Sequence, residues 1–126
     1  MKRRTMKSIF CFSTEVELCE NLSQLLREKG EISSVINLID LKKYLIENVF
    51  DLLIIDLEDY PEEILEILQN YKSQNKNSFI IIFYSFHFHK PTFENLIYKL
   101  ADSVFFKPIS IEDVLTVVDK NLKRGK

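Results

Sequence analysis

The chain has 126 residues, a formal net charge of −2 at pH 7 and 29% charged residues. This length fits one domain that buries a sizeable core without disulfides or a structural metal, so we expect a single domain over 1–126. The near-neutral charge excludes a global basic field for nucleic acid, and no apolar run reaches the roughly 18 residues that span a bilayer. The basic ends, 1–7 and 123–126, are typical of solvated termini.

The two cysteines, Cys11 and Cys19, are too far apart for a CxxC motif and fall in apolar stretches. This placement predicts buried free thiols in a reducing compartment. The basic N-terminus leads into a strand-like segment with no small-residue cleavage site, so we expect a cytoplasmic protein.

The first predicted unit is a strand followed by a helix. Ser8–Phe12 is a short apolar run rich in β-formers, and Ser13-Thr14 after it can cap a helix. Leucines at helical spacing follow, and Gly30 is expected to end this helix in a left-handed conformation. The leucines are Leu18, Leu22, Leu25 and Leu26.

The second unit is a weaker strand, Ser33–Ile36, whose polar content is expected nearer a sheet edge. Asn37 or Asp40 can start the helix after it. The apolar residues of that helix are Leu38, Leu41 and Leu45. The third strand ends at Asp56 and contains four consecutive aliphatic residues, a pattern that indicates burial on both faces.

Pro61 stands where a first-turn proline opens the third helix, and Lys72–Asn77 is predicted as a polar loop. Phe79–Tyr84 is a second strand that is apolar on both faces. The next helix aligns four apolar residues on one face, and they are Phe93, Leu96, Ile97 and Leu100. Ser103–Phe106 is the last predicted strand, broken by Lys107-Pro108. The stripe of the terminal amphipathic helix is Ile111, Val114, Leu115, Val118 and Leu122.

Strands and helices thus alternate five times with short connections. This alternation predicts an α/β fold, a doubly wound five-stranded parallel sheet with five helices joined by right-handed crossovers. A strand order of 2-1-3-4-5, taken by analogy with flavodoxin-like sheets, would place the two most apolar strands inside.

Polar side chains follow the strands at the predicted carboxyl edge: Ser13-Thr14, Asp56, Ser85 and Lys107. A carboxylate, a hydroxyl and an ammonium are the groups needed for phosphoryl chemistry on an aspartate. Asp56 would be the nucleophile, Ser85 a donor to a phosphoryl oxygen, and Lys107 a compact cation that pairs with either. The alternative is that Asp56 only caps the turn after its strand.

The chain resembles a response-regulator receiver domain, the CheY-like module that accepts a phosphoryl group from a histidine kinase. Phe50–Asp56 is similar to the acceptor strand, Ile82–Ser85 to the Ser/Thr strand, and Ala101–Pro108 to the Ala-Asp…Lys-Pro segment of that family. The resemblance covers nearly the whole chain. It implies that the aspartate, serine and lysine named above are the acceptor, the switch hydroxyl and the conserved lysine.

The resemblance also implies a magnesium site, for which an acidic pair normally follows the first strand. Here Ser13 and Thr14 stand in place of that pair. The remaining ligands would be the Asp56 carboxylate and the backbone carbonyl of Glu58. Because Mg²⁺ prefers charged oxygen ligands, we expect it to bind weakly.

Several positions depart from the family pattern. Glu15 or Glu17 could reach the metal site, although their simpler role is to complement the helix dipole. Phe86 follows the switch hydroxyl where the family prefers a small residue, and Val104 stands at the place of the switching aromatic. These departures make a degenerate pseudo-receiver plausible.

Two function hypotheses stay open. The first is a stand-alone receiver-like domain in phosphorelay signalling, because the chain ends one helix after Lys107-Pro108; it would bind a histidine kinase or phosphotransfer protein and a downstream target. The alternative is a phosphorylation-independent adaptor or scaffold. Beyond self-catalysed phosphoryl transfer at Asp56 we expect no enzymatic activity, and with only Gly30 and Gly125 there is no glycine-rich loop for a flavodoxin-like cofactor.

The resemblance implies a partner or dimer surface on the fourth helix, fifth strand and fifth helix. Its candidate residues are Phe93, Tyr98, Val104 and Phe105. His87 and His89 form an HxH pair, which is a weak metal signal and is more typical of loop histidines.

Overall fold

The computed structural model describes residues 7–85 and 91–124 and contains within them a five-stranded sheet in which a helix follows each strand. The elements are β1 (Lys7–Phe12), α1 (Val16–Leu26), β2 (Gly30–Val35), α2 (Leu38–Glu47), β3 (Leu52–Asp56), α3 (Pro61–Gln74), β4 (Phe79–Tyr84), α4 (Pro91–Leu100), β5 (Ser103–Phe106) and α5 (Ile111–Arg124).

The strands pair in the order β2-β1-β3-β4-β5, and every neighbouring pair is parallel. β3 is buried along its whole length and β4 along all but its first residue, whereas the edge strands β2 and β5 are partly exposed. Continuous apolar runs therefore lie inside the sheet, where both faces are covered. The predicted fold class and strand order are confirmed.

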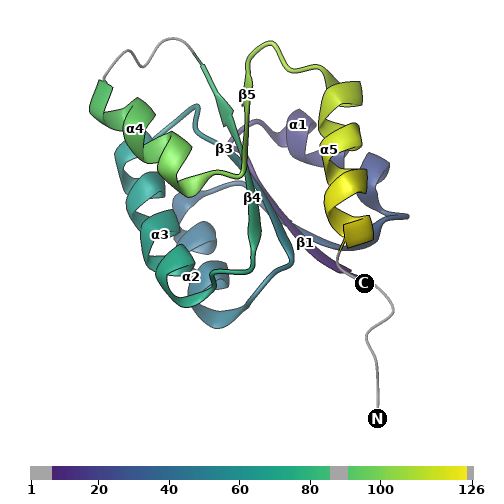
Figure 1. Cartoon of the computed structure of the whole chain (residues 1–126), viewed down its shortest axis with the longest axis horizontal. Coiled ribbons are helices and arrows are strands. Elements are labelled where there is room, and N and C mark those ends of the chain that lie inside the picture. Colours follow the sequence, from purple (N-terminus) through teal and green to yellow (C-terminus); the bar gives the residue numbers. More distant parts are fainter. Residues whose placement is uncertain (1–6, 86–90, 125–126) are drawn as a thin grey trace.

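Helices cover both faces of the sheet (Figure 1), with α1 and α5 on one face and α2, α3 and α4 on the other. The side chains of β1 contribute alternately to the two cores, because successive side chains of a strand point to opposite faces of the sheet. Phe10 and Phe12 pack in the core under α2, α3 and α4, and Ile9 and Cys11 pack under α1 and α5.

The prediction that Gly30 ends the first helix in a left-handed conformation is wrong. Gly30 is the first residue of β2, and no glycine in the described residues has positive φ. A Cβ atom at this position would lie 2.5 Å from the carbonyl oxygen of Lys7. Glycine is needed here because the backbones of β1 and β2 approach closely. The second strand accordingly begins three residues before the predicted Ser33.

Two further expectations need correction. α3 continues to Gln74, so it takes in the first part of the segment predicted as a loop. Lys72 explains this extension in part, because its ammonium donates to the carbonyl oxygen of Ser78 at 2.7 Å and so bridges the helix end to β4. Leu25 is exposed, because the buried line of α1 runs through Cys19, Leu22 and Leu26.

The two predicted helix caps differ in outcome. Asn37 caps α2, since its side chain accepts a hydrogen bond from the backbone N–H of Asp40 at 2.8 Å. Ser13-Thr14 does not cap α1, whose N-cap residue is Glu15 without a side-chain cap bond. Both hydroxyls donate to carboxylates instead.

Cys11 and Cys19 are free and buried, as predicted. Burial raises the pKa of both thiols above the ordinary value. No helix in the described part of the chain is long and apolar enough to cross a membrane. The predictions for Phe86, His87 and His89, and those for the basic segments at 1–6 and 125–126, lie outside the described residues.

Candidate functional site

Strand register brings the predicted site positions to one edge of the sheet. Phe12 pairs with Ile55, so Ser13 and Asp56 follow at the ends of adjacent strands β1 and β3. Tyr84 pairs with Phe106, so Ser85 and Lys107 follow at the ends of β4 and β5. Parallel strands all end on the same side, which is why one carboxylate, hydroxyls and one ammonium meet there.

The Asp56 carboxylate is buried, with 2% of the residue exposed, and accepts hydrogen bonds on both oxygens. Oδ2 accepts from the Ser13 hydroxyl at 2.7 Å, and Oδ1 accepts from the backbone N–H of Glu58 at 3.2 Å. The ammonium of Lys107 contacts both oxygens, at 2.8 Å from Oδ1 and 3.0 Å from Oδ2. These donors satisfy a buried charge that would otherwise be costly.

Lys107 lies at the centre of three carboxylates. Besides Asp56, its Nζ atom contacts Oε1 of Glu58 at 2.9 Å and Oε2 of Glu15 at 3.1 Å. We call Asp56, Glu58, Glu15 and Lys107 the Lys107 cluster. Three carboxylates against one ammonium leave the cluster with two negative charges in excess.

Burial alone would lower the pKa of Lys107, because it penalises the charged form. Hydrogen bonds to Asp56 and Glu58, together with the charge of Asp56 and the hydrogen bond to Glu15, outweigh that penalty and raise the pKa above the ordinary value. The ammonium is therefore a permanent internal cation at neutral pH.

Sequence reasoning missed the role of the Glu58 side chain. It assigned only the backbone carbonyl of Glu58, as a metal ligand, whereas the backbone N–H donates to Asp56 and the carboxylate contacts Lys107. Glu15 does reach into the site, toward Lys107, and Glu17 remains exposed in the first turn of α1, where it complements the helix dipole. The sequence did contain a signal for the role of the Glu58 side chain, because Glu58 follows Asp56 by only two residues.

Ser13 and Thr14, at the place of the usual acidic pair, have separate partners. The Ser13 hydroxyl donates to Asp56 and accepts from the backbone N–H of Glu15 at 2.9 Å. The Thr14 hydroxyl donates to Oδ2 of Asp59 at 2.6 Å. Of the two, Ser13 therefore contacts Asp56, and Thr14 joins the loop after β3.

Ser85 is buried immediately after β4, two residues beyond Phe83, which pairs with Asp56. The neighbouring backbone is fixed by the N–H of Lys107, which donates to the carbonyl oxygen of Tyr84 at 2.9 Å. Val104, at the place of the switching aromatic, is half-buried in β5 and packs against the core under α4.

The residues present do not fit a magnesium ion in this arrangement. Carboxylate oxygens are suitable ligands by type, but Asp56, Glu58 and Glu15 all point at the Lys107 ammonium, which a cation would have to displace. Ser13 offers a neutral hydroxyl whose proton is directed at Asp56. No group of three His, Cys, Asp or Glu residues in the described part of the chain is arranged to hold a metal ion.

No family model matches this sequence, and no curated protein matches it. Many solved structures share the fold. A CheY-like response regulator receiver domain protein from Methanospirillum hungatei superposes with a TM-score of 0.82 at 16% identity, over 95% of this chain and 96% of that one. The receiver domain of Francisella response regulator 1452 gives 0.77 at 18% identity, over 95% and 99%.

The response regulator protein TrrA from Thermotoga maritima, solved in complex with Mg²⁺-BeF, gives a TM-score of 0.72 at 25% identity. The match covers 92% of this chain and 99% of that one. Strand order and helix placement agree with the fold that the resemblance implied. The chain thus has the fold of the CheY-like response-regulator receiver domains.

Proposed function

We propose that this chain is a receiver-like signalling domain of a two-component pathway, with Asp56 as its candidate phosphoacceptor. The observation that carries this proposal is the contact of the Lys107 ammonium with both oxygens of the buried Asp56 carboxylate. A positioned carboxylate beside a compact cation is what phosphoryl transfer to an aspartate requires. Solved receiver domains that share this fold support the assignment.

In the proposed transfer, one Asp56 oxygen attacks phosphorus while the bond from phosphorus to the donor's leaving group breaks. Lys107 and Ser85 would stabilise the charge that develops on the phosphoryl oxygens. Both Asp56 oxygens are engaged by Lys107, so the ammonium must release one of them first. The two excess negative charges of the Lys107 cluster oppose an incoming anion, and we therefore propose that transfer is slow.

The phosphoryl donor would be a histidine kinase or a phosphotransfer protein, and a downstream protein would receive the signal. We propose no enzymatic activity beyond self-catalysed transfer at Asp56. The surface implied for partners or a homodimer lies on α4, β5 and α5. Of its candidates, Tyr98 is exposed, whereas Phe93, Val104 and Phe105 are half-buried and pack against the two cores.

A second function, a phosphorylation-independent adaptor, is favoured by a different observation. Ser13 places a neutral hydroxyl where the family has a carboxylate, and the Asp56 charge is already compensated by Lys107. In this case the domain would signal by its surface alone, and the Lys107 cluster would serve stability.

Intact mass after incubation with phosphoramidate and Mg²⁺ separates the two functions. The receiver hypothesis predicts a slow gain of one phosphoryl group that Asp56→Asn abolishes. Asp51→Asn, at the other end of β3, is the matched control and should still be modified. If the wild-type mass does not change under conditions that modify an ordinary receiver, the adaptor is the correct function.

A further inference from the structure

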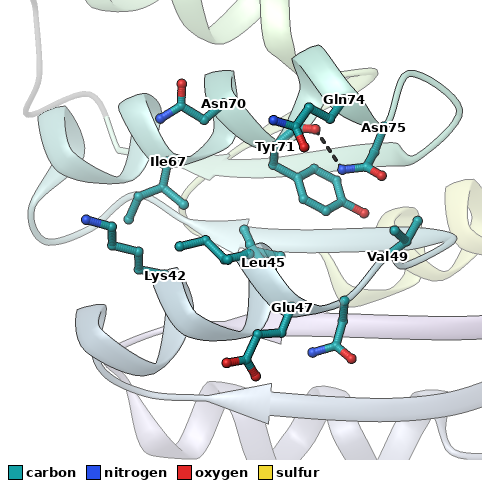
Figure 2. Close-up of a pocket in the computed structure, with 11 residues that line it drawn as sticks. Lys42, Leu45, Glu47, Val49, Ile67, Asn70, Tyr71, Gln74 and Asn75 are labelled. Atoms are coloured by element: carbon teal, nitrogen blue, oxygen red, sulfur yellow. Dashed lines mark hydrogen bonds between the residues drawn. The ribbon is translucent and has the colours of Figure 1, made fainter.

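A cavity of about 260 Å³ lies between α2 and α3 (Figure 2). Leu45 and Lys42 of α2 face Ile67 and Tyr71 of α3 across it. It lies near the carboxyl end of α2, which leads into the start of β3, and so is at the opposite end of the sheet from Asp56. The cavity has an apolar floor and does not belong to the site described above.

An exposed stripe on α2 continues into this cavity. Ile39, Ile46 and Val49 are 80%, 72% and 66% exposed, which is unusual for large aliphatic side chains. The spacing of seven residues places Ile39 and Ile46 on one side of the helix, with Lys42 and Lys43 between them, and Val49 follows two residues after the helix ends. Lys42, Ile46 and Val49 also line the cavity, so the stripe and the cavity form one surface.

Lys42 and Lys43 bring two ammonium groups to this surface and Glu47, which also lines the cavity, brings one carboxylate, so the surface has one positive charge in excess in a chain whose net charge is −2. Neither Lys42 nor Lys43 forms an ion pair with a carboxylate in the described part of the chain, unlike Lys29, Lys72 and Lys107. A partner with carboxylates at matching positions would therefore find two uncompensated ammonium groups flanked by apolar area.

We propose that the α2 stripe and the adjoining cavity bind an acidic amphipathic segment of a partner protein. One apolar side chain of the segment enters the cavity beside Leu45 and Ile67, and its carboxylates pair with Lys42 and Lys43. Apolar anchors that fill a pocket supply affinity, and the rim charges select the partner. The inference does not depend on phosphorylation at Asp56.

Two other occupants fit this surface less well. In a symmetric dimer with antiparallel α2 helices, Ile39 of one copy meets Ile46 of the other, and the Lys42-Lys43 pairs face each other on the two-fold axis. Like charges at that position oppose self-association. A membrane surface is disfavoured because α2 carries only two lysines, beside Asp40 and Glu47, on a negatively charged chain.

The test uses a synthetic helical peptide with leucines at i, i+3 and i+7 and glutamates between them, and a counterpart in which lysines replace the glutamates. Amide chemical shifts of the ¹⁵N-labelled protein map the contact, and fluorescence anisotropy gives the affinity. The variants are Ile46→Asp and the double variant Lys42→Glu with Lys43→Glu. Their matched controls are Leu25→Asp, at an exposed position of α1, and Lys76→Glu with Lys120→Glu, which changes the net charge equally.

We expect the acidic peptide to shift resonances of α2, Val49 and α3, and both test variants to weaken its binding at least about tenfold. The controls should bind as wild type does, and the lysine peptide should not bind. The proposal is overturned by shifts that map elsewhere, by equal loss in the controls, or by equal binding of the lysine peptide. A dimer that Ile46→Asp dissociates, or binding to vesicles of phosphatidylglycerol through α2, would also overturn it in favour of those occupants.

Discussion

One aspartate directly precedes β3 and another is the last residue of the strand, and the two side chains have different hydrogen-bond donors. Asp51, before the strand, accepts from the backbone N–H of Ser8 at 2.8 Å and from the Ser8 hydroxyl at 3.3 Å. Asp56, at the end of the strand, is paired with the ammonium of Lys107 inside a group of three carboxylates. The contacts of Asp51 with Ser8 come from neutral donors, whereas Asp56 contacts an ammonium that it shares with two further carboxylates.

A buried network of neutral groups also lies at the amino end of the sheet. Tyr71, Ser78 and the backbone of Phe50 form a buried network in which the Tyr71 hydroxyl accepts from the Phe50 N–H at 2.9 Å and Ser78 donates to the Phe50 carbonyl at 2.6 Å. This network closes without charge. The comparison teaches that neutral hydrogen bonds join buried groups at the amino end, whereas one ammonium joins three carboxylates at the carboxyl end, so loss of a single cation should cost more there.

The largest expected effect comes from removal of the ammonium at the carboxyl end of the sheet. Lys107→Met leaves the buried Asp56 and its two carboxylate neighbours without their cation, and we expect a loss of about 3–5 kcal/mol in the free energy of unfolding. The matched control is Lys72→Met at the amino end, where Lys72 lies 3.8 Å from one carboxylate, that of Asp102. Urea titrations measure both, and equal losses would contradict the comparison.

The pH dependence of the unfolding free energy tests the contribution of the same ammonium. The folded-state pKa of Lys107 is raised, so its contribution to stability is fully present below the unfolded pKa of about 10.4 and is lost as pH rises through the folded value. The difference in unfolding free energy between wild type and Lys107→Met should be constant between about pH 7 and about pH 10 and shrink above that range. Cys11 and Cys19 are buried in both proteins, so their titration cancels in this difference. A difference that grows with pH would mean that the cluster does not stabilise the ammonium.

The affinity for Mg²⁺ tests whether added carboxylates turn the carboxyl end of the sheet into a metal site. Ser13→Asp with Thr14→Asp replaces a neutral donor to Asp56 with charged oxygens, so we expect Mg²⁺ to bind at least about tenfold more tightly, which is about 1.4 kcal/mol. Wild type should bind the ion weakly, because Lys107 already occupies the carboxylates. Calorimetric titration of both proteins measures this. Tight binding by wild type would mean that the ion displaces the ammonium, with Glu15 or Glu58 as a ligand.

Much of the fold and part of the site followed from local sequence pattern. Continuous apolar runs indicated the interior strands, and the position of Asp56 and Lys107 after strands placed them at one edge, since parallel strands end together. The contact between them at 2.8 Å agrees with that inference.

The remaining features depend on contacts between distant segments. Gly30 after a helix is equally consistent with a helix stop and a strand start, and only the approach of the Lys7 carbonyl distinguishes them. Glu15 and Lys107 meet across most of the chain, and Thr14 turns to Asp59 because that carboxylate is within its reach. Such choices among partners follow from tertiary position, which no local pattern encodes.

The smallest expected effect concerns Asp51, at the amino end of the sheet. Asp51→Asn removes a charge but keeps an oxygen that can accept from the Ser8 N–H, so we expect a loss below about 1 kcal/mol in unfolding free energy. Asp51 directly precedes β3 and Lys107 contacts Asp56 at the end of that strand, about 16 Å away at about 3.3 Å per residue, so the loss should not depend on the lysine. The double variant Asp51→Asn with Lys107→Met should therefore show the sum of the two single losses. Coupling above about 0.5 kcal/mol in this cycle would contradict this independence and show that the two ends of β3 are linked electrostatically.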